Sequence, residues 1–232
     1  PAYIAAQEGH EASIWALAEL GADLNTSKND GTTPAFIAAQ GGHEATIRAL
    51  AELGADLNTP KKNGATPAYI AAQEGHEASI WALAELGADL NASNNNGATP
   101  AYIAAQEGHE AIIRALAELG ADLNTPKKNG TTPAFIAAQQ GHEATIRALA
   151  ELGANINTPN TDGTTPACIA AQNGHEATIR ALAELGADLN ASNNNGATPA
   201  FIAAQEGHEA SIRALAELGA DLNASNNNGA TP

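Results

Sequence analysis

The chain has 232 residues, of which 44% are hydrophobic and only 3% aromatic, so any core must be built mainly from Ala, Leu and Ile. Its formal net charge of −16 disfavours nucleic acids and anionic membranes as partners, because phosphate contacts need clustered basic side chains. No apolar run approaches the roughly 20 residues of a membrane-spanning helix, and the single cysteine, Cys168, cannot form an internal disulfide.

One segment recurs along the whole chain with a period of 33 residues. "GATPAYIAAQEGH" at 64–76 returns unchanged at 97–109. A fixed period of this size indicates a stack of similar units. The last residue, Pro232, is the repeat equivalent of Pro1, and we therefore expect the chain to be a segment of a longer array. The seven copies, taken as one array over 1–232, fall at 1–33, 34–66, 67–99, 100–132, 133–165, 166–198 and 199–231.

The first helix of each copy is clearest at the start of the third copy. Thr66 is a candidate helix N-cap, since its side-chain oxygen can accept a backbone N–H of the first turn. Pro67 fits the first helical position, where its missing N–H costs nothing. We expect a helix over 67–74 that ends at Gly75, a residue suited to the left-handed conformation.

A second helix and a loop complete the copy. Apolar residues at a spacing near 3.6 predict a helix over 76–86, and Gly87 is expected to end it. The loop that follows closes at Asn96–Gly97, a strong tight-turn signal. Isolated helices shorter than about 12–15 residues are marginal in water. Each helix pair must therefore bury its apolar side against the next pair.

The unit resembles the ankyrin repeat over the whole chain. The letters "TPAYIAAQEGH" and "GADLN" correspond to the family's TPLHLAA, GH and GADVN and stand at matching offsets. The resemblance implies an all-α fold, an ankyrin-repeat solenoid of stacked helix-turn-helix units with β-hairpin or loop connections. It also implies a partner surface made of the hairpin tips and the exposed part of the first helix.

The chain departs from the family at two positions of the first helix. Alanine replaces the family's leucine, as at Ala35 and Ala68. Where the family has histidine, most copies have an aromatic residue, and we expect the aromatic ring to fill the volume that the alanines give up. Loss of that histidine removes the hydrogen bonds that tie the TPLH turn in the family. The substituted residues are Tyr3, Phe36, Tyr69, Tyr102, Phe135, Cys168 and Phe201.

The recurring histidines, the cysteine and the acidic residues are the candidates for chemistry. Equivalent histidines of stacked helices lie about 8–10 Å apart, too far to share one metal ion with bonds of about 2 Å. Cys168 has no base or oxyanion site built around it. Carboxylates such as Glu11 and Glu77 recur in one setting and cannot be tuned to opposite acid and base roles. We expect no catalytic residue, no metal site and no cofactor.

One position of the second helix alternates between arginine and tryptophan. Each arginine has a glutamate four residues before it and four after it, as Arg48 has Glu44 and Glu52, and such pairs stabilise a helix. A tryptophan between glutamates is either covered by a neighbouring element or a contact point for another molecule. The arginines are Arg48, Arg114, Arg147, Arg180 and Arg213, and the tryptophans are Trp15 and Trp81.

Other candidate partner contacts are lysines at the hairpin tips and polar residues that end the first helices. The tips vary most between copies, which free drift of a surface loop also explains. The lysines are Lys28, Lys61, Lys62, Lys127 and Lys128, and the helix-end residues are Gln73, Glu74, Gln106 and Glu107. Because the helix-end positions hardly change between copies, the surface suits a periodic partner, another copy of the chain, or no partner.

The sequence is compatible with two functions. The first is a non-catalytic protein–protein interaction scaffold that uses the hairpin tips and the inner helices. The alternative is a structural rod or filament assembled end to end, since neither terminal copy carries a distinct polar cap. An intracellular location is favoured over an extracellular fibre, and glycosylation would require secretion. The N-x-S/T sequons, which an Asn-rich loop also generates by chance, are Asn25, Asn91, Asn129, Asn190 and Asn223.

Overall fold

The computed structural model describes all residues 1–232 and contains only α-helices and loops, with no residue in a strand. Every copy supplies one short helix and one longer helix. The first helices are α1 (Ala2–Gln7), α3 (Pro34–Gln40), α5 (Pro67–Glu74), α7 (Pro100–Glu107), α9 (Pro133–Gln140), α11 (Pro166–Gln172) and α13 (Pro199–Glu206). The second helices are α2 (Glu11–Glu19), α4 (Glu44–Glu52), α6 (Glu77–Glu85), α8 (Glu110–Glu118), α10 (Glu143–Glu151), α12 (Glu176–Glu184) and α14 (Glu209–Glu217).

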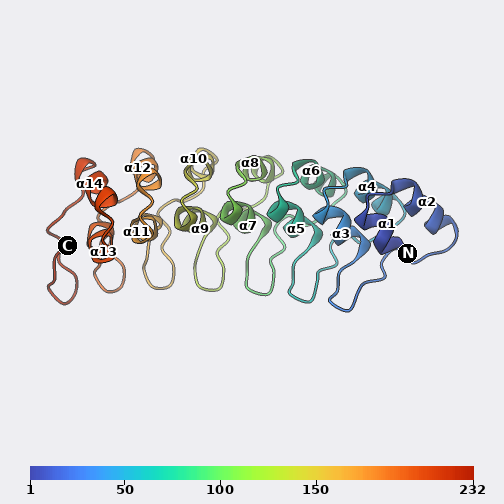
Figure 1. The fold of residues 1–232 in the computed structure, drawn as a ribbon, viewed down its shortest axis with the longest axis horizontal. Helices are drawn as coiled ribbons and strands as arrows, with labels where there is room; N and C mark the ends of the chain where they lie inside the picture. The colour runs from blue at the N-terminus through green and yellow to red at the C-terminus, as the bar shows by residue number, and fades with distance from the viewer. The chain divides into compact units, whose positions relative to one another are not determined.

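The chain divides into two compact units. Unit 1 comprises residues 1–104 and 114–122, and unit 2 comprises residues 105–113 and 123–232. Within unit 1, α3 packs between α1 and α5, and α4 packs between α2 and α6. Within unit 2, α11 and α12 pack in the same way between the flanking helices of their own row. In each unit the first helices lie between the second helices and the loops (Figure 1). That all seven copies form a single array stays a prediction.

The predicted ends of the first helix are confirmed. Thr66 Oγ1 accepts the backbone N–H of Tyr69 at 3.2 Å, and Pro67 is the first residue of α5. Gly75 follows the helix with φ +77°, in the left-handed region that glycine adopts without strain. Thr132 caps α9 in the same manner.

The second helix is one residue shorter at each end than predicted. It spans Glu77–Glu85, with His76 and Leu86 as its flanking cap residues. Beyond Leu86, the N–H of Gly87 donates to Ala84 O and the N–H of Ala88 donates to Leu83 O. This pair of bonds is the Schellman arrangement that satisfies the last carbonyls of a helix.

The core consists of isoleucine and leucine from the second helices and alanine from the first. Ile80, Leu83 and Ala71 are wholly buried. Small alanine side chains let neighbouring first helices pack closely, and larger residues fill the space beside them. Most residues in the histidine position take part, since Phe135 is 3% exposed and Cys168 is fully buried. Tyr3 and Phe201, in the first and last copies, are only half-buried.

Histidines of the later copies join consecutive copies. His43 Nε2 lies 2.9 Å from the carbonyl oxygen of Gln7, and His142 Nε2 lies 2.9 Å from that of Gln106. The His43 ring covers Gly9, where an added Cβ would come within 2.6 Å of Nδ1. The histidines therefore pack and bond between copies, in keeping with the structural role expected of them.

Candidate partner-binding surface

The loop tips of consecutive copies are joined by backbone hydrogen bonds. In unit 1 the N–H of Lys62 donates to Asp30 O at 3.0 Å. In unit 2 the N–H of Asn227 donates to Asn195 O at 3.0 Å, and Asn227 Nδ2 donates to Asn194 O at 3.0 Å. These bonds fix the tips in register, so that side chains of one tip stand beside equivalent side chains of the next.

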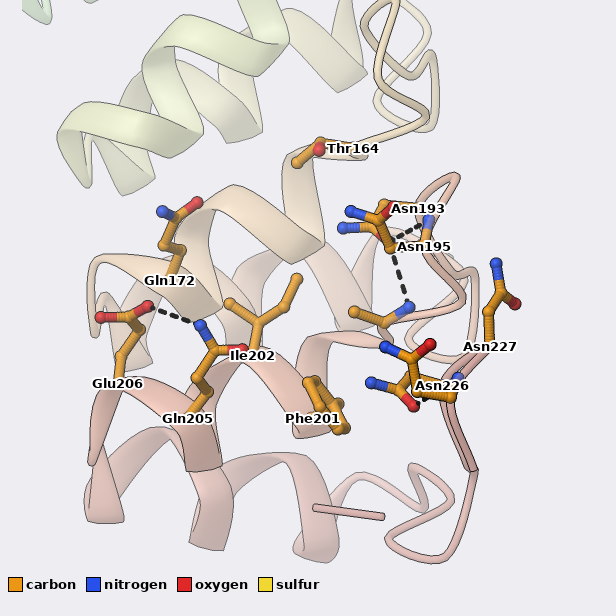
Figure 2. A pocket seen from close by; sticks show the side chains of 12 residues that line it. Thr164, Gln172, Asn193, Asn195, Phe201, Ile202, Gln205, Glu206, Asn226 and Asn227 are labelled. Atoms are coloured by element: carbon orange, nitrogen blue, oxygen red, sulfur yellow. Dashed lines mark hydrogen bonds between the residues drawn. The ribbon is translucent and has the colours of Figure 1, made fainter. Parts of the chain in front are cut away.

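A groove of about 510 Å³ opens between loop tips and first helices of unit 2. Its centre is apolar, with half-buried Phe201 and buried Ile202. Amide side chains line both sides, and the ring of Phe201 lies between the glutamines of the helices and the asparagines of the loops (Figure 2). The polar residues include Gln172, Gln205 and Glu206 from the helices and Asn193, Asn195 and Asn226 from the loops.

Two of the candidate lysines lie over the aromatic residue of their own copy. Lys28 Nζ is 3.8 Å from the centre of the Tyr3 ring, and Lys61 Nζ is 5.1 Å from that of Phe36. Lys61 Nζ is also 3.1 Å from an Asp30 carboxylate oxygen. Sequence reasoning missed these cation–π contacts, although a tip lysine and an aromatic residue occur together in these copies. Of the other tip lysines, Lys62 and Lys128 are exposed and Lys127 is partly buried, and Lys127 and Lys128 have partners.

The candidate residues at the ends of the first helices differ in exposure. Gln73 and Gln106 are half-buried, whereas Glu74 and Glu107 are exposed. The backbone carbonyl oxygen of Gln106 bonds to His142, and the side-chain amide of Gln106 donates to Glu107 at 3.0 Å. The glutamates are therefore the more available members of this set.

Arg48, Arg147 and Arg180 each form an ion pair with a glutamate of the next copy, and for them the predicted pairing with the glutamate four residues later is wrong. Arg48 Nε lies 2.9 Å from Glu44 as expected, but Nη1 lies 2.8 Å from Glu85 of the next copy and not beside Glu52. Arg147 repeats the arrangement with its own second helix and the next one. The adjoining helix brings its terminal glutamate opposite the guanidinium, which has donors for two carboxylates at once. Hydrogen bonds to Glu44 and Glu85 raise the pKa of Arg48.

Both tryptophans are half-buried. They are therefore neither fully covered by a neighbouring element nor fully exposed to a partner. The indole N–H of Trp15 donates to Glu11 at 3.4 Å, a long and weak bond within one helix. Neither indole is sealed into the core. Their role as contact points stays a prediction.

The asparagines of the sequons have structural partners. The side-chain oxygens of Asn25, Asn91 and Asn190 each accept the backbone N–H of the aspartate 31 residues later, at 2.8 Å. Asn129 Oδ1 accepts the hydroxyl of Thr131 at 2.7 Å, and the N–H of Asn223 donates to Asp221 at 2.8 Å. The bonds between copies explain why asparagine ends the "GADLN" segment. Glycosylation of these residues stays a prediction.

The remaining reactive groups are dispersed or covered. Burial raises the pKa of the Cys168 thiol, which keeps it protonated, and Sγ lies 3.5 Å from Ala191 O. No group of three or more His, Cys, Asp or Glu side chains is placed to hold a metal ion. No helix has both the length and the apolar character required to cross a membrane.

The comparisons with known proteins define the class of this chain. The family model described as "Ankyrin repeats (3 copies)" matches residues 2–94, 87–160 and 152–226. The ankyrin repeat domain of human ASB11 is similar at 27% identity and a TM-score of 0.82, over 94% of this chain and 97% of that one. The ankyrin repeat domain of Bcl-3, described as a unique member of the IkappaB protein family, is similar at 25% identity and a TM-score of 0.80, over 93% and 97%.

The chain therefore belongs to the ankyrin repeat family, and its fold is that of the ankyrin-repeat solenoids. Ankyrin repeats are interaction domains that bind protein partners and are generally non-catalytic, and this chain is such a scaffold. No curated protein matches the chain in sequence.

Proposed function

We propose that the chain binds its protein partner through the loop tips and first helices, and that the groove of unit 2 is one contact area. The observation that carries this proposal is the combination of an apolar centre, Phe201 and Ile202, with amide side chains on either side. Such a composition suits a polypeptide partner, because binding sites combine apolar contact with a few oriented polar groups.

The amide groups supply hydrogen bonds of both kinds. Asparagine and glutamine side chains each offer a carbonyl acceptor and two N–H donors, the complement of a peptide backbone. Asn195 and Gln205 are exposed on opposite sides of the groove. The acidic net charge of −16 supports a protein partner over a nucleic acid.

Photo-crosslinking at defined positions tests this proposal. A benzophenone amino acid is placed at Asn195, at Gln205 or at the exposed Ala177 of α12, and each protein is irradiated in extract of the source cells. We expect one discrete adduct of constant stoichiometry from both groove positions and none from Ala177. The variants Asn195→Arg and Gln205→Arg should weaken capture without changing the melting temperature. Equal crosslinking at Ala177, or none at the groove, would contradict the proposal.

A structural rod is a second candidate function, in which the partner is another copy of the same chain. The feature that favours it is the uniform bonding between copies, in which the Asn25–Asp56 bond of unit 1 recurs as Asn157–Asp188 in unit 2. Light scattering separates the two functions. Polymers whose size rises with protein concentration would favour the rod, and a monomer at all concentrations would exclude it.

A further inference from the structure

Trp15 and Trp81 occupy the position of the second helix that is arginine in the other copies. We call this position, with the two glutamates beside it, the slot. In the copy between them, Arg48 lies 2.9 Å from Glu44 of its own helix and 2.8 Å from Glu85 of the next copy. Trp15 stands one period before Arg48, and Trp81 stands one period after it. These two copies keep the surrounding acidic residues but lack the positive charge.

The carboxylates around Trp15 are left without a cation. Glu11 and Glu52 correspond by the repeat to Glu44 and Glu85, and both are exposed. Neither forms an ion pair, and the hydrogen bond of this cluster is the weak 3.4 Å contact from the Trp15 indole N–H to Glu11. Because α2 and α4 pack as α4 and α6 do, Glu52 comes from the helix beside Trp15.

Trp81 has the same surroundings by the repeat. Glu77 precedes it by four residues, and Glu118 corresponds to Glu85 in the next copy. Both glutamates are exposed, and neither forms an ion pair. Unit 1 thus carries two positions where a half-buried indole adjoins uncompensated negative charge.

We propose that Trp15 and Trp81 are docking points for arginine side chains of a partner protein. A guanidinium group stacks on aromatic faces and bonds carboxylates in a forked geometry, so it matches both components of the slot. Arg48 is the internal example, because its guanidinium already bonds the two carboxylates of the equivalent slot. These docking points lie on the second helices, away from the loops, and do not depend on the function proposed above.

The spacing of the docking points restricts the partner further. Packed helices lie about 8–10 Å apart, so two consecutive steps from α2 through α4 to α6 span about 16–20 Å. An extended peptide rises about 3.3 Å per residue and covers this span in about five or six residues. The structure therefore favours a partner segment in which two arginines are separated by about five residues.

Peptide binding to the full chain tests the inference. The probe is a fluorescein-labelled peptide with two arginines separated by about five Ser and Gly residues, and the matched control peptide carries neutral citrulline in their place. We expect the arginine peptide to bind more tightly in a fluorescence anisotropy titration. The charge-preserving variant Trp15→Leu/Trp81→Leu should weaken its binding about tenfold, the combined effect of two cation–π contacts. Equal binding of both peptides, or no effect of the variant, would overturn the inference.

Three further variants keep the test decisive. Trp15→Arg/Trp81→Arg installs the residue of the other copies, so it should fold, fill both slots internally and lose the preference for the arginine peptide over the citrulline peptide. In the double-leucine background, Arg180→Trp should restore part of that binding, because Glu176 and Glu217 already flank this slot. The charge-matched Arg180→Leu should restore none. If the tryptophan and leucine variants at position 180 bind alike, the indole is not the recognition element and the inference fails.

Discussion

Arg48 bonds the glutamate of a neighbouring copy, Glu85, with its Nη1 atom 2.8 Å from the carboxylate. The same guanidinium bonds Glu44 within its own helix. Arg147 and Arg180 form the corresponding pairs in unit 2. An exposed side chain thereby links two copies that the apolar core also joins.

Removal of one such arginine should weaken the fold in a salt-dependent manner. We expect Arg147→Gln to lower the urea midpoint slightly at an ionic strength of about 0.01 M, because two ion pairs to glutamates are lost. The pairs are largely exposed and salt screens them, so the difference should shrink at about 1 M. Circular dichroism at both salt concentrations measures the effect. A difference that stays undiminished in high salt would show that the arginine acts through packing alone.

The carboxyl group of Asp30 should stay ionised at unusually low pH. The side-chain hydroxyl and backbone N–H of Thr32 donate to it, and Lys61 lies beside it, so its pKa falls well below the ordinary value of about 3.9. A lowered pKa in the folded state means that the unfolded chain binds more protons. The stabilisation is therefore complete above about pH 3.9 and is lost as the pH falls through the folded value.

Carboxyl NMR titration measures this directly. In the native chain, the Asp30 resonance should remain that of the carboxylate at about pH 3, where an ordinary aspartate is largely protonated. Thr32→Val removes the hydroxyl donor and should raise the pKa toward the ordinary value. Titration of native Asp30 at the ordinary value would refute the assigned hydrogen bonds.

Two threonines of consecutive helices should respond in opposite ways to the same substitution. Thr145 is buried in α10 with no partner for its hydroxyl, whereas Thr132 caps α9 by accepting the Phe135 N–H at 3.2 Å. Thr145→Val should stabilise the chain by about 1 kcal/mol, because an unsatisfied buried hydroxyl is removed. Thr132→Val should destabilise it by about 1 kcal/mol through loss of the cap.

An apolar residue already occupies the position of Thr145 in another copy. Ile112 occupies the same position of α8 and is 1% exposed. Urea denaturation of both valine variants gives the two free energies of unfolding. If both variants shift in the same direction, the hydroxyl of Thr145 has a partner in solution, such as a buried water.

The aromatic residue in the histidine position should contribute strongly to stability. Phe135 is 3% exposed, and Phe135→Ala should lower the free energy of unfolding by about 3–5 kcal/mol, as truncation of a buried aromatic does. Phe201 is only half-buried and makes a matched control, for which a smaller loss is expected. Thermal unfolding of both variants provides the comparison, and an unchanged melting temperature for Phe135→Ala would remove the volume argument.

The sequence alone predicts the local structure closely. Thr66, Pro67 and Gly75 define the first helix because helix ends depend on the hydrogen bonds and backbone angles of a few consecutive residues. The second helix is predicted to within one residue at each end, a normal uncertainty for frayed termini. The period of 33 residues then indicates which elements must pack together.

Contacts between copies could not be predicted to the same degree. The choice of Glu85 over Glu52 as partner of Arg48 depends on the offset between α4 and α6, which no local pattern encodes. The contact between Lys61 and Phe36 lies within one copy, but it likewise depends on the path of the loop. The repeat specifies equivalent positions in each copy but not the distance between them.

One helical hairpin cannot bury its apolar side alone and therefore folds only against its neighbours. Circular dichroism of a peptide comprising the third copy, residues 67–99, tests it most directly, with the full chain measured in parallel. We expect the full chain to be helical and to melt cooperatively, and the peptide to have the spectrum of an unfolded chain. A peptide with the helix content of the full chain and its own cooperative melting transition would contradict the claim.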